Sequence, residues 1–120
     1  MAKVVALVDD LFFQAKLLET ARQAGVELRV VTSAGALSSE ASARPALIVV
    51  DLNGRSEPLS AIEMLRAAGN PAPVIAFFSH VHNGLAQRAR AAGCREVMPR
   101  SEFTRNLAAI LAAVRLEGGS

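Results

Sequence analysis

Three aspartates are the side chains of this 120-residue chain whose positions best suit chemistry. Asp9 and Asp10 directly follow the apolar run 4–8, and Asp51 directly follows the apolar run 47–50. Glutamate is spread over the helical segments, as expected for solvated faces. Aspartate disfavours the interiors of helices and strands, but a solubilising role alone would not confine all three aspartates to strand ends. Carboxylates gathered at strand ends can bind a hard cation and supply an oxygen nucleophile. The aspartates are therefore the first candidates for a functional site.

The strands that would carry these aspartates follow a regular alternation. Five apolar runs alternate with five helix-like segments, and the predicted strands are residues 3–8, 27–32, 46–50, 73–78 and 95–98. The first, third and fourth are almost continuously apolar, as in parallel strands covered on both faces, whereas the second alternates and is expected at an edge. This alternation predicts a flavodoxin-like (βα)5 fold, a parallel five-stranded sheet in the order 2-1-3-4-5 between two helix layers. The first and third strands are neighbours in that order, so the three aspartates should converge.

Caps and breakers delimit the predicted helices. The first is expected over residues 11–24, ending at Gly25, with an apolar face of Phe12, Ala15, Leu18 and Ala21. We expect Phe12 and Phe13 in the core, although their place beside Asp9-Asp10 could let them shape the rim of a pocket there. Phe77 and Phe78 are expected to pack against the two opposite helix layers from the centre of the sheet. The other helices are expected over 34–43, from Pro58 to Gly69, from a cap at His82 or Asn83 to Gly93, and from about Thr104 with the apolar face Leu107, Ile110, Leu111 and Val114.

Composition restricts the class of protein. The formal charge is +2 and the arginines are scattered, so we expect no nucleic-acid partner. No apolar stretch approaches the roughly 20 residues of a membrane span, so we expect no membrane partner. Cys94 is the single cysteine, which excludes an internal disulfide and fits a reducing cytoplasm. We expect one cytoplasmic domain over residues 1–116 and a flexible tail over 117–120.

Polar residues follow four of the predicted strands in a recognisable pattern. Asp9-Asp10 follows the first, Asp51 the third, Ser79 the fourth and Arg100 the fifth. The pattern resembles the CheY-like receiver domains of two-component response regulators over nearly the whole chain. The resemblance implies that Asp51 accepts a phosphoryl group from a phosphohistidine on a sensor histidine kinase or phosphotransfer protein. It further implies Mg²⁺ ligation by Asp10, Asp51 and the backbone carbonyl of Asn53 with water-mediated support from Asp9, and phosphoryl binding by Ser79 and Arg100.

The resemblance also implies a role in phosphorelay signal transduction. The chain would be modified itself, with any transfer and hydrolysis self-catalysed, and would not be an enzyme with a separate substrate. A downstream protein target would contact the face made by the fourth helix, fifth strand and fifth helix, where Arg88, Arg90 and Val97 are candidate contacts.

Several positions depart from the family pattern. Arg100 stands at the usual lysine position when the connection after Gly93 is aligned without a gap; alignment on the following proline would place Met98 there. His80 replaces a small residue, and Val97 replaces the usual aromatic residue of the fifth strand. These departures leave a second hypothesis open, a phosphorylation-independent pseudo-receiver that acts as a protein-interaction module with its acid pocket neutralised by Arg100.

A flavin- or nucleotide-binding enzyme of the same fold is disfavoured. Such a protein needs a turn after the first strand whose backbone amides bind phosphate. Here that turn is Asp9-Asp10-Leu11-Phe12, and its carboxylates would repel phosphate in the absence of a metal ion. The His80-x-His82 spacing is read as a loop feature because no third soft ligand is evident.

Overall fold

The computed structural model describes residues 3–80 and 84–118. Its strands are β1 Lys3–Leu7, β2 Glu27–Val31, β3 Leu47–Asp51, β4 Val74–Phe78 and β5 Glu96–Pro99. Its helices are α1 Leu11–Ala24, α2 Ala34–Ala41, α3 Pro58–Ala67, α4 Leu85–Ala91 and α5 Arg100–Gly118. The predicted alternation of strands and helices is confirmed.

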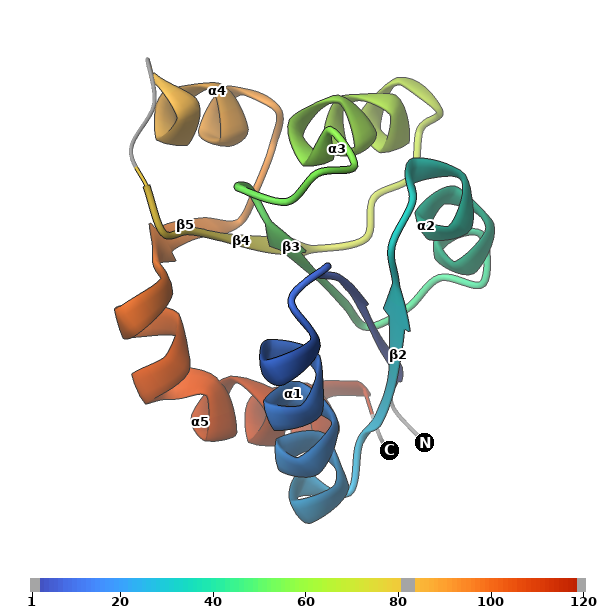
Figure 1. The fold of residues 1–120 in the computed structure, drawn as a ribbon. Coiled ribbons are helices and arrows are strands. Elements are labelled where there is room, and N and C mark those ends of the chain that lie inside the picture. Colours follow the sequence, from blue (N-terminus) through green and yellow to red (C-terminus); the bar gives the residue numbers. More distant parts are fainter. Residues whose placement is uncertain (1–2, 81–83, 119–120) are drawn as a thin grey trace.

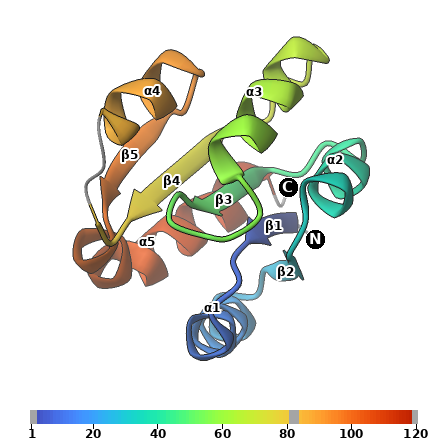
Figure 2. The same ribbon diagram turned by 45° about the horizontal axis from the view of Figure 1, so that its top comes forward.

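The five strands form one parallel sheet in the order β2-β1-β3-β4-β5. Helices α1 and α5 cover one face of the sheet, and α2, α3 and α4 cover the other (Figure 1). This is the predicted flavodoxin-like fold, and β2 lies at an edge as its alternating pattern indicated. The order places β1 beside β3, with Val4 to Leu7 paired with Leu47 to Val50, so the loops after these strands meet at one edge of the sheet (Figure 2).

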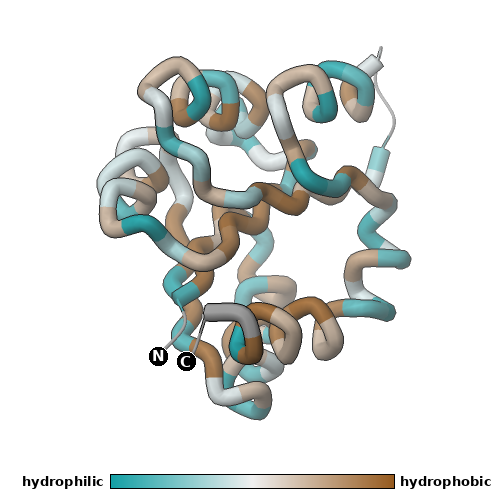
Figure 3. Tube along the Cα trace, turned by 180° about the vertical axis from the view of Figure 1, so that it is seen from behind, coloured by the Kyte–Doolittle hydropathy of each residue, from teal (hydrophilic) through white to brown (hydrophobic). Residues whose placement is uncertain are grey.

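The central strands carry the core. Every residue of β3 is buried, and the hydrophobic part of the trace runs through the middle of the molecule while polar segments lie outside (Figure 3). Below the sheet, the rings of Phe13, Phe77 and Phe103 pack together, with Phe77 and Phe103 stacked at a centroid distance of 4.8 Å. Aromatic packing of this kind anchors α1 and α5 to β4.

The predicted apolar face of α1 was wrong at three of its four residues, since only Ala21 among them is buried. Phe12 is 91% exposed, Leu18 is 46% exposed and Ala15 is also exposed. The buried residues of α1 are instead Phe13, Leu17 and Ala21. The helix carries apolar doublets, Phe12-Phe13 and Leu17-Leu18, so a helical repeat fits either member of each pair. Packing against the other two phenylalanines selects Phe13, and Phe12 is therefore not a core residue.

Three boundaries differ from or extend beyond the expectations. Helix α5 begins at Arg100 rather than near Thr104, so its first turn includes the fully buried Phe103. Helix α2 ends at Ala41, short of residue 43. The expected caps His82 and Asn83 lie outside the described residues. Helix α5 continues to Gly118, two residues into the segment 117–120 that was expected as a flexible tail. The domain division at residue 116 stays a prediction.

No helix within residues 3–80 and 84–118 combines the length and the apolar character that a bilayer crossing requires.

Candidate functional site

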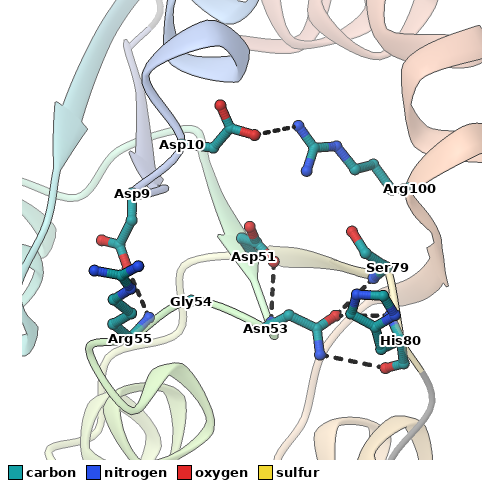
Figure 4. A pocket seen from close by; sticks show the side chains of 9 residues that line it. All are labelled: Asp9, Asp10, Asp51, Asn53, Gly54, Arg55, Ser79, His80 and Arg100. Atoms are coloured by element: carbon teal, nitrogen blue, oxygen red, sulfur yellow. Dashed lines mark hydrogen bonds and ion pairs between the residues drawn. The ribbon is translucent and has the colours of Figure 1, made fainter.

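A pocket of about 440 Å³ opens at the carboxyl edge of the sheet, among the loops that follow β1, β3, β4 and β5. The six residues predicted for the acceptor site all line it, so the expected convergence is present (Figure 4). The complete lining consists of Asp9, Asp10, Asp51, Asn53, Gly54, Arg55, Ser79, His80 and Arg100. Sequence reasoning missed Gly54 and Arg55, which belong to the loop after Asp51.

Asp51 is the last residue of β3 and the most buried carboxylate of the pocket, with 7% of its surface exposed. Burial raises the pKa of Asp51 above its usual value, and the nearby charges of Asp9 and Asp10 raise it further. The Asn53 backbone N–H, which donates to Asp51 Oδ1 at 2.9 Å, and the charge of Arg100 act in the opposite direction. Asp51 therefore carries a charge that the surrounding protein only partly stabilises.

Asp10 is held by three donors. Its Oδ1 accepts the backbone N–H groups of Phe12 at 2.9 Å and Phe13 at 3.1 Å, which makes it the N-cap of α1. Its Oδ2 accepts Nη2 of Arg100 at 2.9 Å. The Arg100 hydrogen bond and these backbone groups lower the pKa of Asp10 despite some desolvation. Both oxygens of Asp10 thus already have protein partners.

Asp9 shapes the loop that follows Asp51. Its Oδ2 accepts the backbone N–H of Arg55 at 2.6 Å. Gly54 lies between the two aspartates, because a Cβ placed on it would stand 3.2 Å from Asp9 Oδ2 and 3.3 Å from the Asp51 carbonyl oxygen. A larger residue would push these groups apart, so glycine is what allows the loop to close against Asp9.

Asn53 connects the loop after β3 with the loop after β4. Its side-chain Oδ1 accepts the backbone N–H groups of Ser79 at 2.6 Å and His80 at 3.1 Å. Figure 4 shows Ser79 and His80 on the wall of the pocket opposite Asp9. Both Ser79 and His80 are exposed, so the expected hydroxyl lies at the open side of the pocket.

The oxygen donors of the pocket are of the kind that Mg²⁺ accepts, namely one or two carboxylates with carbonyl and water oxygens. The partly compensated charge of Asp51 also favours a cation. Within the described residues, however, no three His, Cys, Asp or Glu side chains form a group that could hold a metal ion. The pocket thus supplies suitable donors, but Asp10 is engaged by Arg100.

The expected partner face lies on α4 and β5. Arg88 and Arg90 are exposed on α4, as a contact surface requires. Val97 is half-buried and packs against the core cluster on that side of the sheet. Arg88, Arg90 and Val97 therefore all stay candidate contacts, with Val97 presenting a smaller exposed surface than the arginines.

Proteins of known structure with a similar fold include response regulators and their receiver domains. A Francisella response-regulator receiver domain superposes with a TM-score of 0.82 at 14% identity over 98% of both chains. The chain has the fold of a response-regulator receiver domain. A two-component response regulator from Clostridium difficile gives a TM-score of 0.81 at 14% identity over 100% of both chains. The chemotaxis response regulator CheY4 of Vibrio cholerae gives 0.79 at 21% identity, over 95% of this chain and 98% of that one.

Comparison of sequences alone does not detect the similarity to receiver domains. No protein-family model matches the chain, and no curated protein matches it in sequence. The likeness to receiver domains is therefore one of architecture, and the chemistry of this chain has to be argued from its own pocket.

Proposed function

We propose that this chain is a receiver domain that accepts a phosphoryl group on Asp51 in a Mg²⁺-dependent phosphorelay. The observation that carries the proposal is the placement of Asp51, which is buried at the end of β3 in a pocket lined by two further carboxylates, a hydroxyl and a guanidinium. A buried carboxylate whose pKa is raised by burial and by neighbouring charges is a frequent property of functional sites.

In the proposed transfer, each residue of the pocket has a different role. An oxygen of Asp51 attacks phosphorus, the P–N bond to the donor histidine breaks, and the imidazole keeps the electron pair of that bond. The Asn53 backbone N–H holds Oδ1 of Asp51 in place. Ser79 and Arg100 line the same pocket and would bind the phosphoryl oxygens as the group moves from the imidazole to Asp51.

A divalent ion, held by Asp10, Asp51 and the Asn53 carbonyl with Asp9 in support, would reduce the repulsion between the phosphoryl group and Asp51. Hydrolysis of the acyl phosphate by water would return the carboxylate, so the chain would not turn over a separate substrate.

The surface beside the pocket suits a protein donor. Leu11 is 76% exposed and Phe12 is 91% exposed, and both directly follow Asp10. Exposed apolar side chains next to a polar cavity are common at protein–protein contacts. They support a sensor histidine kinase or phosphotransfer protein as donor, while Arg88 and Arg90 on α4 are proposed contacts for a downstream protein. These roles would be carried out in the cytoplasm, which is the location that we propose for the chain.

The ion pair of Arg100 and Asp10 favours a second candidate function. Arg100 occupies Oδ2 of a proposed metal ligand and adds a cation to the pocket. A pseudo-receiver would keep this pair permanently and would act through protein contacts without phosphorylation.

One experiment separates the two functions. The protein is incubated with Mg²⁺ and beryllofluoride or a small acyl phosphate, and uptake is followed by backbone amide shifts and intact mass. Phosphoacceptor function predicts uptake that Asp51→Asn abolishes and that Glu63→Gln, an exposed carboxylate of α3, leaves unchanged. A folded wild-type protein that shows no uptake at saturating donor contradicts it and supports the pseudo-receiver.

A further inference from the structure

One side chain, that of Asn53, links two of the four loops around the Asp51 pocket, the loop after β3 and the loop after β4. Asn53 Oδ1 accepts from the backbone N–H groups of Ser79 and His80 at 2.6 and 3.1 Å, and Asn53 Nδ2 donates to the carbonyl oxygen of His80 at 3.3 Å. The backbone N–H of the same residue donates to Asp51 Oδ1 at 2.9 Å. Asn53 therefore connects Asp51 with the backbone of Ser79 and His80, which lie 26 and 27 positions after Asn53 in the chain.

The chemistry of these contacts suits a carboxamide. The side chain accepts two N–H groups at Oδ1 and donates one N–H from Nδ2, so it needs an acceptor atom and a separate donor atom, which an amide has and a carboxylate or hydroxyl lacks. An aspartate at this position would keep the two acceptor bonds but would lose the donor and add a fourth negative charge to the pocket. An alanine would leave all three backbone groups of Ser79 and His80 without this partner.

We propose that the Asn53 carboxamide is a positioning group that fixes the Ser79–His80 backbone and so sets the place of the Ser79 hydroxyl relative to Asp51. This side-chain role is separate from the metal-binding carbonyl expected of Asn53. Its consequence for phosphoryl binding rests on the proposed function.

The physical basis is the exposure of the loop that carries the hydroxyl. Ser79 is exposed and directly follows the last residue of β4, so burial does not fix its side chain. A hydroxyl contributes to transfer only when it is held where phosphoryl oxygens will lie. Hydrogen bonds from a residue that is itself anchored to Asp51 provide that restraint.

The first test uses the metal-free protein and needs no phosphoryl chemistry. Backbone hydrogen exchange of Ser79 and His80 should accelerate about tenfold in Asn53→Ala, because each N–H loses its acceptor. Asn53→Asp should keep exchange slow, since the carboxylate still accepts both N–H groups. Exchange at Ser79 and His80 that is unchanged in Asn53→Ala overturns the proposal.

Asn70 provides a matched control. Its carboxamide bridges a different pair of segments, accepting from the Ala72 N–H at 2.9 Å and donating to the Ala41 carbonyl at 2.9 Å, and it does not line the Asp51 pocket. Asn70→Ala should leave exchange at Ser79 and His80 as in the wild type. Equal acceleration in Asn70→Ala would show general loosening of the fold and would also overturn the proposal.

The second test measures beryllofluoride affinity in the presence of Mg²⁺. Asn53→Ala should weaken it about tenfold, as should Ser79→Ala, and the double variant should be little weaker than either single variant because both changes remove the same placed hydroxyl. Fully additive losses overturn the link through Ser79. A wild type that binds no beryllofluoride contradicts the phosphoacceptor function, whereas amide exchange in Asn53→Ala still decides whether Asn53 holds the loop.

Discussion

Arg100 pairs with Asp10, with Nη2 lying 2.9 Å from Oδ2, and its guanidinium carbon lies 4.2 Å from the centroid of the Phe13 ring. The Arg100 guanidinium is thus held both by the carboxylate of Asp10 and by a cation–π contact with the Phe13 ring. Arg100 is the first residue of α5 and Asp10 is the N-cap of α1, so the pair joins the beginnings of two helices beside the pocket. A metal ion that uses Oδ2 of Asp10 must therefore displace an arginine.

Removing this arginine should increase metal affinity. Arg100→Ala frees Oδ2 of Asp10, and Mg²⁺ should bind about two- to fivefold more tightly, in line with the modest free energy of a partly exposed ion pair. Calorimetric titration measures this change, with the exposed Arg88→Ala as control. Equal affinities in both variants would show that the pair does not compete with metal. Loss of cooperative unfolding in Arg100→Ala would show that the arginine is structural.

Neutralising Asp51 should stabilise the fold. Its pKa is raised from an ordinary value of 3.8, so the folded state favours the protonated form and ionisation destabilises it. Asp51→Asn should therefore raise the free energy of unfolding by about 1 kcal/mol at neutral pH, a typical gain when a functional group is removed. Urea denaturation measures this change as a higher midpoint concentration than that of the wild type. The gain should appear as pH rises above 3.8 and vanish below it. A variant less stable than wild type at pH 7 would contradict this.

Asp10 should show the opposite dependence on pH. Its pKa is lowered from 3.8, first by the hydrogen bond from Arg100, so its ionised form stabilises the folded state. Asparagine is also a good N-cap, so Asp10→Asn removes the charge and keeps the cap. The variant should be less stable than wild type at pH 7, and the difference should shrink as pH falls below 3.8. Urea unfolding at several pH values measures it, and a difference independent of pH would refute the electrostatic origin.

Two phenylalanines test the core. Phe103 is fully buried against Phe13 and Phe77, so Phe103→Ala should lower the free energy of unfolding by about 3–5 kcal/mol. Phe12→Ala removes a side chain that is 91% exposed and should change stability by less than about 0.5 kcal/mol. Chemical denaturation of both variants checks the assignment, and similar losses would place Phe12 in the core.

Two glycines test the loop after Asp51. Gly54→Ala would press a methyl group against Asp9 and the Asp51 carbonyl, so it should destabilise the fold by about 1 kcal/mol and shift the Asp9 and Arg55 amide resonances. Gly35 of α2 has no atom within 4 Å of an added Cβ, and Gly35→Ala should stabilise by roughly 0.5–1 kcal/mol. Thermal unfolding and amide spectra measure both. Unperturbed resonances in Gly54→Ala would show that the loop has room.

The fold and the convergence of the aspartates could be predicted because both depend on patterns local in sequence. Apolar runs mark buried parallel strands, and the order of five such strands fixes which loops meet. The phase of α1 could not be predicted, because Phe12 and Phe13 satisfy the same helical repeat and contacts with distant rings decide between them.

The finer organisation of the pocket also depends on tertiary geometry. The sequence indicated that Arg100 belongs near the acids, but not that it would bind Asp10, whose second oxygen is free to pair because the first caps α1. The side-chain contacts of Asn53 were missed for a similar reason. They join loops whose separation is set by the pairing of β3 with β4.

The complete burial of Leu47 to Val50 in β3 helps to explain how chains can share this architecture at low sequence identity. Leucine, isoleucine and valine can replace one another at such positions at small energetic cost, so the packing is kept while the residue type changes. Low sequence identity to structures of the same fold is the expected result.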